Sequence, residues 1–346
     1  GVAFSQNISS KLDAAVKKLM NSPAAVSSSL SFYVSDEKGD KVYDFNASKG
    51  LSTASTQKIF TAAAALETLG KNYTYKTYAG FSGTLTAGNL EGNFIVTSTG
   101  DPTLGSWRYE GFSPENFKFK LLEAVKKSGI KKISGNLIID DSYFDHQTIP
   151  GGWPWDDLGN YYGAGVWGIN WRENQFDIKI KGTEFKSFSY TLKNVKWLND
   201  LEAEGNSDQS LIFTAPHSEV ALINGKLPAA TVTTVSGSVP NPPMQLGAEI
   251  KSWFKESGIE FTGNVISNSQ LELNGEKPVR LPENNRIFTY ESPTLDKIIF
   301  YFLRKSINFY GETLLKTMAK EKTGNPSFKS GVAFMKDFWK AKGINP

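Results

Sequence analysis

The chain has 346 residues, of which 39% are hydrophobic and 21% charged, so it is typical of a folded globular protein of about two domains and not of a disordered chain. The 38 basic residues nearly balance the 35 acidic residues and are scattered, which argues against nucleic acid as the main partner. The chain has no cysteine, which excludes disulfides, thiolate catalysis and cysteine-ligated metals. It has only two histidines.

The first part of the chain predicts a helix, a hairpin and a second helix. Residues 8–20 carry apolar side chains on one helical face. Two strand-like runs, residues 29–35 and 41–46, flank a turn with a glycine, as in a β-hairpin. Residues 51–70 then predict an Ala-rich helix whose buried face begins at Ile59. This order favours an α+β fold with an antiparallel sheet.

From residue 73 the predicted elements are mainly strands until the chain becomes helical again. Strands are predicted at residues 74–81, 93–98, 135–139 and 176–180, and helices at residues 114–127, 244–257, 295–305, 309–320 and 327–342. Residues 183–236 predict a small nested β domain. Helical sequence therefore brackets a β-rich middle, which predicts one domain from residues 1–72 and 289–346 and a second domain, residues 73–288, inserted into it.

Ser55 and Lys58 form a Ser-x-x-Lys pattern at the start of the Ala-rich helix. Residues three apart on a helix are neighbours, with Cβ atoms about 5–6 Å apart, so a hydroxyl and an amine here form a candidate nucleophile and base. Burial of Lys58 would lower its pKa toward that of a base. Taken alone, the pattern also fits an N-cap serine followed by a solvated lysine.

Ser306 and Asn308 flank one apolar residue, Ile307, between two predicted helices. In an extended or tightly turned segment, both polar side chains could face one cleft. The alternative is that they cap the helix that follows, since Ser and Asn are both favoured N-cap residues.

Ser-x-x-Lys and Ser-x-Asn motifs occur together in penicillin-binding proteins and serine β-lactamases. The whole chain resembles a D-alanyl-D-alanine carboxypeptidase/endopeptidase of the low-molecular-mass class C penicillin-binding proteins. The stretches that carry the resemblance, in the order of that family, are STASTQKIFTAAAALETLG, GNFIVTSTGDPTLGS, ISGNLIIDDSYFD, PGGWPWDDLGNYYGAG and KSINFYGETLLKTMA.

The resemblance implies an α/β (α+β) fold, in which a transpeptidase-like domain, an antiparallel sheet flanked by helices, carries a large β-rich inserted domain. It implies that Ser55 attacks the penultimate D-Ala carbonyl and forms an acyl-enzyme that water hydrolyses. Lys58 would accept the proton, Ser306 would return one to the leaving group, and Asn308 would orient Lys58 and the substrate amide. The Ser55 backbone N–H would form half of an oxyanion hole.

Asp157 matches the family position that meets the amine end of the stem peptide, although a capping or loop role is an equal alternative. The implied partners are peptidoglycan stem peptides and β-lactam antibiotics. No cofactor, metal or nucleic acid is expected, and no apolar run predicts an integral membrane segment. The family implies a periplasmic or otherwise extracytoplasmic location, although no signal peptide is visible. No particular oligomeric state is indicated.

Three short patterns are predicted to be coincidental. Lys322-Thr323-Gly324 spells a motif that the family carries on a strand much further along, yet here it follows Ser306 by 16 residues in a polar segment. The strand with the family motif is expected after the last predicted helix. Residues 163–168 spell G-x-G-x-x-G but follow no predicted strand, so a dinucleotide site is not expected. The pairs Asp140-Asp141 and Asp156-Asp157 are predicted to be solvated.

Two other functions fit the same resemblance. A non-catalytic wall-binding protein on this fold is one, because the Lys-Thr-Gly strand is not found in these residues. A β-lactamase is the other, and the long insertion disfavours it because such enzymes are compact.

Overall fold

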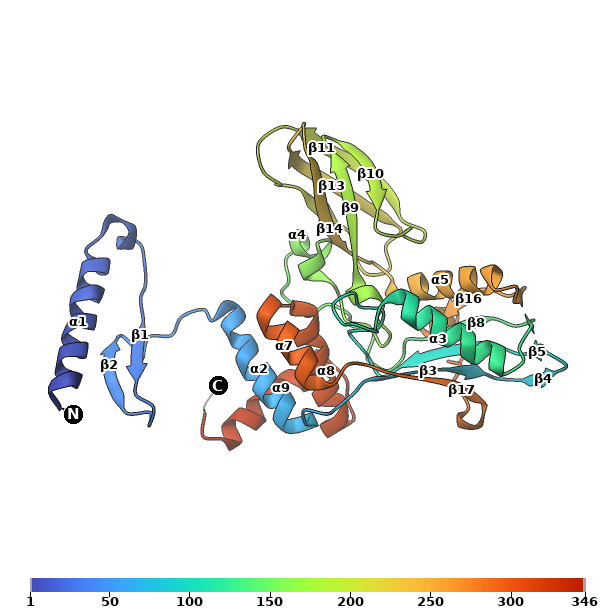
Figure 1. Ribbon diagram of the computed structural model, residues 1–346, viewed down its shortest axis with the longest axis horizontal. Coiled ribbons are helices and arrows are strands. Elements are labelled where there is room, and N and C mark those ends of the chain that lie inside the picture. The colour runs from blue at the N-terminus through green and yellow to red at the C-terminus, as the bar shows by residue number, and fades with distance from the viewer. Residues whose placement is uncertain (1, 345–346) are drawn as a thin grey trace. The chain divides into compact units, whose positions relative to one another are not determined.

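The structure, a computed structural model, describes residues 2–344, with side chains from residue 8 onward. It contains helices and several separate sheets, so the predicted mixed α/β class is confirmed (Figure 1). The chain forms two compact units, Gly1–Gln57 and Lys58–Pro346. Among the described residues, none of the helices combines the length and apolarity that crossing a bilayer requires.

The first unit is a helix packed against a hairpin. Its elements are α1 (Val2–Met20), the short 3₁₀ helix η1 (Pro23–Ala25), β1 (Phe32–Ser35), β2 (Lys41–Phe45) and the 3₁₀ helix η2 (Ala54–Gln57). Strands β1 and β2 pair antiparallel, as predicted. In the turn, one Asp36 carboxylate oxygen accepts hydrogen bonds from the backbone N–H groups of Lys38 and Asp40, both at 2.9 Å. Gly39 adopts φ +86°, a conformation that glycine reaches without strain.

The second unit contains a cluster of helices around α8. Its members are α2 (Lys58–Leu69), α7 (Leu295–Lys305), α8 (Asn308–Thr323) and α9 (Phe328–Ala341) (Figure 1). Helix α8 contacts the other three. The buried face of α2 is made by Ala62, Ala64 and Ala65, whereas Ile59 is exposed, so the prediction for Ile59 was wrong. Small alanine side chains let α2 and α8 approach closely, and Ile59 lies outside the buried face of α2.

A five-stranded mixed sheet forms the second part of this unit. Its strands, in spatial order, are β16 (Val265–Ser267), β8 (Leu137–Asp140), β6 (Phe94–Ser98), β3 (Lys76–Phe81) and β17 (Arg286–Glu291). The β16–β8 and β8–β6 pairs are parallel, and the other two pairs are antiparallel. Strands β6 and β8 are short apolar runs buried on both faces, which is typical of central parallel strands.

Helices cover both faces of this sheet. Helices α3 (Pro114–Lys127) and α5 (Pro242–Glu256) pack on one face, where alternate residues such as Phe94 and Val96 meet them in one apolar core. Helix α6 (Asn268–Leu273) lies on the other face, where Leu271 packs with Ile95 and Ile138. Helix α3 has the predicted bounds, because the Ser113 side chain caps its first turn ahead of Pro114.

The remaining strands form three smaller sheets. The order β10–β9–β14 joins β10 (Glu184–Phe188), β9 (Gln175–Lys181) and β14 (Val232–Ser238). The order β11–β13–β12 joins β11 (Lys196–Ala203), β13 (Val220–Leu227) and β12 (Leu211–Phe213) (Figure 1). These two sheets share one apolar core. The order β15–β7–β5–β4 joins β15 (Glu260–Phe261), β7 (Lys132–Ile133), β5 (Asn89–Glu91) and β4 (Thr84–Thr86).

Two neighbouring strands connect the helical cluster to the five-stranded sheet. Strand β3 follows α2, strand β17 precedes α7, and the two strands pair antiparallel. At their junction with the helices, the Tyr75 backbone N–H donates to Ser292 Oγ at 2.9 Å. The buried Tyr75 hydroxyl lies 3.0 Å from the Thr317 hydroxyl of α8. The chain therefore leaves the helical cluster through β3 and returns to it through β17, and these two strands lie side by side.

A buried carboxyl, Asp101, has a strongly asymmetric environment. Its Oδ1 accepts hydrogen bonds from the Thr103 backbone N–H (2.7 Å) and hydroxyl (2.6 Å), while Oδ2 has no hydrogen-bond partner among the described residues. Burial raises the pKa of Asp101 from 3.8 to about 6, although the bonds from Thr103 oppose this change. The folded state therefore binds a proton that the unfolded state has already lost between these two pH values.

We expect the free energy of unfolding of the wild type to fall as pH rises from 4 to 7, because the stability from a raised carboxyl pKa is present below 3.8 and lost above about 6. The pKa change corresponds to ~3 kcal/mol. Asp101→Asn should have a smaller slope than the wild type in urea denaturation at a series of pH values. The exposed Asp337→Asn is the control, and an equal slope in Asp101→Asn would contradict the prediction.

Candidate active site

Lys58 joins two segments that lie far apart in the sequence. It is the first residue of α2, and its ammonium donates hydrogen bonds to Asn308 Oδ1 at 2.6 Å and to Ser306 Oγ at 3.2 Å. The short distance to Asn308 is typical of a charge-assisted hydrogen bond. The structure therefore brings together three of the residues that the sequence singled out.

The loop between α7 and α8 aims Ser306 and Asn308 at this lysine. Ser306 ends α7 in the left-handed conformation, with φ 55° and ψ 43°, and Asn308 begins α8. Between them, Ile307 packs against the apolar core of the helical cluster. A left-handed serine costs about 1 kcal/mol or more, and such strain is characteristic of functional sites. The Ser-x-Asn spacing thus sends one apolar side chain inward and two polar side chains toward Lys58.

The surroundings of Lys58 favour loss of its proton. Burial lowers the pKa of Lys58, and the Glu312 carboxyl of α8 acts in the opposite direction. The N-terminus of α2 adds the positive end of a helix dipole, which also disfavours an ammonium. An amine whose pKa is lowered in this way can act as a base nearer to neutral pH.

Asp157 is linked to this group through Tyr162. Asp157 lies in α4 (Trp155–Leu158), and Tyr162 lies in the 3₁₀ helix η3 (Tyr161–Gly163). The Asn308 side-chain amide donates to the Tyr162 carbonyl at 3.0 Å. Burial first, and then the charge of Asp157 and a hydrogen bond to it, raise the pKa of the Tyr162 hydroxyl. One aromatic residue therefore contacts Asn308 through its backbone and Asp157 through its side chain.

Ser55 lies in η2 of the first unit, so the predicted helix begins at Lys58 and a 3₁₀ turn precedes it. Ala54 adopts a left-handed φ of 43°, and the Thr56 backbone N–H donates to the Thr53 carbonyl at 3.1 Å. The Ser55 side chain is exposed. Ser55 thus stands in a tight turn and not within the regular α-helix that the sequence suggested.

A buried network supports the first turn of α8, and sequence reasoning missed it. The Tyr310 hydroxyl donates to Glu173 Oε1 at 2.8 Å, and the Tyr109 hydroxyl donates to the Tyr310 oxygen at 3.2 Å. Glu173 also accepts hydrogen bonds from the Ser106 hydroxyl at 2.5 Å and from Arg108 Nε at 2.8 Å. Because a buried carboxylate needs such partners, this network fixes Tyr310 two residues beyond Asn308.

The backbone that presents Glu173 is unusual. Arg172, Glu173 and Asn174 all adopt left-handed φ values, between 52° and 54°. Asn174 holds this turn with side-chain hydrogen bonds to the Gly165 carbonyl and to Asn170 Oδ1, both at 2.8 Å. None of these residues is a glycine and the run has no periodic pattern, so no sequence signal marks the turn.

The short patterns that were predicted to be coincidental have structural roles. Lys322 and Thr323 lie in the last turn of α8, and Gly324 caps the helix with φ 74°. In the Gly-rich run, a Cβ on Gly163 would lie 1.9 Å from the Asp157 carbonyl oxygen, and one on Gly168 would lie 2.1 Å from that of Asp141. These glycines therefore allow close protein packing instead of cradling a phosphate.

The prediction that Asp140 and Asp141 are solvated was wrong. Both side chains are buried at the end of β8. Asp140 accepts a hydrogen bond from Asn268 Nδ2 at 2.6 Å and pairs with Arg280, and Asp141 accepts one from the Ser269 hydroxyl at 2.6 Å. They connect the sheet to α6, and no cluster suited to a metal ion occurs among the described residues.

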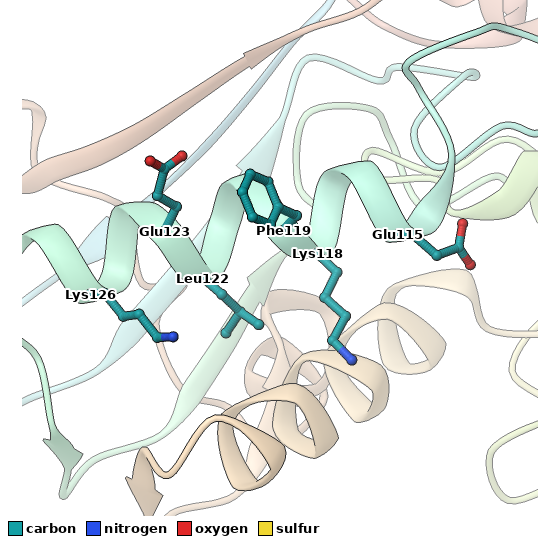
Figure 2. A pocket seen from close by; sticks show the side chains of 6 residues that line it. All are labelled: Glu115, Lys118, Phe119, Leu122, Glu123 and Lys126. Carbon is teal, nitrogen blue, oxygen red and sulfur yellow. The ribbon is translucent and has the colours of Figure 1, made fainter.

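A shallow hollow lies on the surface of α3 and contains none of the predicted site residues. All six lining side chains belong to this one helix: Glu115, Lys118, Phe119, Leu122, Glu123 and Lys126 (Figure 2). Lys118 reaches Glu256 of α5 at 2.6 Å. The hollow is therefore a solvated helix surface, and the chemistry of the second unit is concentrated around Lys58.

Comparisons with known proteins agree with the fold. A sequence model described as the D-Ala-D-Ala carboxypeptidase 3 (S13) family matches residues 12–345. The chain is 26% identical over 314 residues to the D-alanyl-D-alanine carboxypeptidase DacB of Haemophilus influenzae, a match that covers 88% of this chain and 61% of that protein. It is 23% identical to a D-alanyl-D-alanine carboxypeptidase of Actinomadura, covering 89% of this chain and 57% of that protein. The chain thus spans about three fifths of the length of these relatives.

A solved structure has the same fold. The crystal structure of penicillin binding protein 4 from Haemophilus influenzae superposes with a TM-score of 0.71 at 25% identity, covering 89% of this chain and 66% of that one. The same protein has also been solved in complex with a β-lactam.

The hydrogen bond between Lys58 and Asn308 can be measured with a double-mutant cycle. We expect Lys58→Met and Asn308→Ala to be coupled by about 1 kcal/mol or more in free energy of unfolding, because the bond is charge-assisted and partly buried. The exposed pair Lys342 and Glu67, at 2.6 Å, is the matched control, and its coupling should be about 0.5 kcal/mol or less. Equal coupling in the two cycles would contradict the prediction.

Proposed function

The chain belongs to the D-Ala-D-Ala carboxypeptidase 3 (S13) family, and we propose that it is a serine DD-peptidase that cleaves the D-Ala-D-Ala bond of peptidoglycan stem peptides and is acylated by β-lactams. The observation that carries this proposal is the Lys58 ammonium, held between Ser306 and Asn308. An amine with a lowered pKa beside a second hydroxyl can activate a serine for acyl transfer.

We propose Ser55 as the nucleophile, from its place in the Ser-x-x-Lys motif. Ser55 Oγ attacks the carbonyl carbon of the penultimate D-Ala while the neutral amine of Lys58 takes the hydroxyl proton. The tetrahedral intermediate then collapses, the C–N bond breaks, and the leaving D-Ala amine receives a proton through Ser306. Water attacks the resulting ester in a second cycle, which releases the shortened peptide and returns the proton to Ser55. Formation and hydrolysis of the acyl-enzyme both need Lys58 to change its protonation state.

Asn308 has a positioning and a binding role in this proposal. Its side-chain oxygen accepts from Lys58, and its side-chain nitrogen donates to the Tyr162 carbonyl, which fixes the amide orientation. The Ser55 backbone N–H would be one donor to the developing oxyanion. The hydrogen bonds around Asn308 support its role, and the Ser-x-x-Lys sequence supports the role of the Ser55 backbone N–H.

Asp157 is proposed to bind the amine at the end of the stem residue side chain. The half-buried carboxyl lies beside Tyr162, whose carbonyl contacts Asn308. A carboxylate and an ammonium at such a partly desolvated position form a charge-assisted pair. The same chemistry would select stem peptides that carry an amine over those that do not.

The two-domain division is proposed on the same grounds. The catalytic domain would comprise residues 1–72 and 289–346, and the inserted domain residues 73–288. Pairing of β3 with β17 supports this division, because the two ends of the insertion leave the helices together. Pairing of β9 with β14 extends the nested β-rich part upstream of residue 183. A periplasmic or otherwise extracytoplasmic location is proposed because the substrate is peptidoglycan.

We expect a fluorescent penicillin to label the wild-type chain and Ser55→Ala to reduce the labelling at least ~1000-fold, because no other hydroxyl would form the acyl-enzyme. Gel fluorescence and mass spectrometry of the labelled peptide measure this. Ser52→Ala, an exposed serine three residues earlier, is the control and should label like the wild type. Undiminished labelling of Ser55→Ala would refute the assignment.

For Asp157, we expect Asp157→Asn to lower kcat/KM about tenfold or more for a D-Ala-D-Ala peptide whose stem residue carries a side-chain amine, because an ion pair becomes a neutral contact. A peptide with that amine acetylated should respond much less. The adjacent and exposed Asp156→Asn is the matched control. Equal losses for both peptides would show that Asp157 does not meet the amine.

A further inference from the structure

One face of α8 carries three polar residues in successive turns. Asn308, Glu312 and Lys316 are spaced four apart, so their side chains form a row along the helix. The first member binds Lys58 of α2. The row therefore runs from the candidate base into the interior of the helical cluster.

Lys316, at the inner end of the row, is fully buried and held in place. Its ammonium donates to Asp145 Oδ1 at 2.6 Å and to the Gln147 carbonyl at 2.5 Å. It also lies 4.3 Å from the centre of the Phe328 ring, in a cation–π contact. A buried ammonium with this set of partners is fixed in position, and its charge is only partly balanced by the half-buried Asp145.

Glu312 lies on α8 one turn after Asn308, which binds Lys58, and one turn before Lys316. The charged groups that interact with it among the described residues are Lys58, from α2, and Lys316, from its own helix. Burial raises the pKa of Glu312 to about 7, and both lysines oppose this change. Glu312 in turn opposes the effect of burial on the pKa of Lys58. The protonation states of Glu312 and Lys58 are therefore coupled.

We propose that Glu312 is a positioning residue of the site, whose carboxyl sets the charge that Lys58 carries through the contact between α2 and α8. The proposal rests on the function proposed above for Lys58. When Glu312 is ionised, it stabilises the Lys58 ammonium, and when it is protonated, Lys58 loses its proton more easily. The Lys58–Glu312 pair can hold one proton on either member without a change in net charge.

The ammonium of Lys316 lowers the pKa of Glu312, as that of Lys58 does, although burial lowers the pKa of Lys316 itself. It favours the ionised form of Glu312 from the side opposite Lys58, so that burial does not leave Glu312 permanently protonated. From the site inward, the groups are thus the ammonium of Lys58, the carboxyl of Glu312 and the ammonium of Lys316. The carboxylate of Asp145 ends the row.

The test measures the Lys58 pKa directly in protein labelled with ¹³C-lysine, with the Lys58 signal assigned by its loss in Lys58→Arg. We expect Glu312→Gln to lower the Lys58 pKa by about 1, since a favourable negative charge is removed. The acid limb of the pH profile for Ser55 acylation should move to lower pH by the same amount. Glu312→Asp, which keeps the charge, should restore most of the wild-type value.

Glu321→Gln is the matched control, because Glu321 is an exposed carboxyl further along α8. A Lys58 pKa that stays within about 0.3 of the wild type in Glu312→Gln, or that moves equally in Glu321→Gln, overturns the proposal. If Glu312→Gln does not fold, the reciprocal variant decides: Lys58→Met should raise the pKa of Glu312, observed in ¹³C-glutamate-labelled protein, and no change refutes the coupling.

The two proposals fail in different ways. If β-lactams do not acylate Ser55 in the wild type, the DD-peptidase assignment fails while the lysine and glutamate titrations still report the coupling. If acylation occurs but the Lys58 titration ignores Glu312, the peptidase assignment stands and the positioning role is wrong.

Discussion

The contact on which the site depends joins the ammonium of Lys58 to Ser306 and Asn308, which are 248 and 250 residues further along the chain. The fold of the chain between these residues must place α2 and α8 beside each other. The alanine-rich face of α2 allows the close approach, and the paired strands β3 and β17 return the chain to the helices. The formation of these charge-assisted hydrogen bonds thus depends on the geometry of the whole second unit.

Strained and buried polar groups surround that contact, and each is held by its neighbours. The left-handed Ser306 points its hydroxyl at Lys58. Glu173, in a left-handed turn, accepts a hydrogen bond from the Tyr310 hydroxyl. Such conformations cost of order 1–3 kcal/mol each and persist only where the surrounding structure fixes them. The apolar cores of the sheet and helices supply that support, so the rigid parts of the unit stabilise the irregular parts that carry chemistry.

Local signals in the sequence predicted the elements well and the buried polar groups poorly. The bounds predicted for α3 and α7 were right, because the periodicity of apolar residues acts over a few residues. The solvated state predicted for Asp141 was wrong, because its partner Ser269 comes from a distant segment. Glu312 likewise had no signal of its own, since its role depends on α2 packing beside α8.

The separation between Lys58 and Asn308 also governs the order in which the protein is made. Lys58 leaves the ribosome before its partners, which emerge only after the five-stranded sheet and the β-rich sheets have been synthesised. The β-rich sheets pair over shorter stretches of chain, as β9 does with β10, and can fold as units during translation. The nascent chain therefore carries its candidate base without its partners while the residues between Lys58 and Ser306 are synthesised, and the site can be assembled only once α8 has emerged.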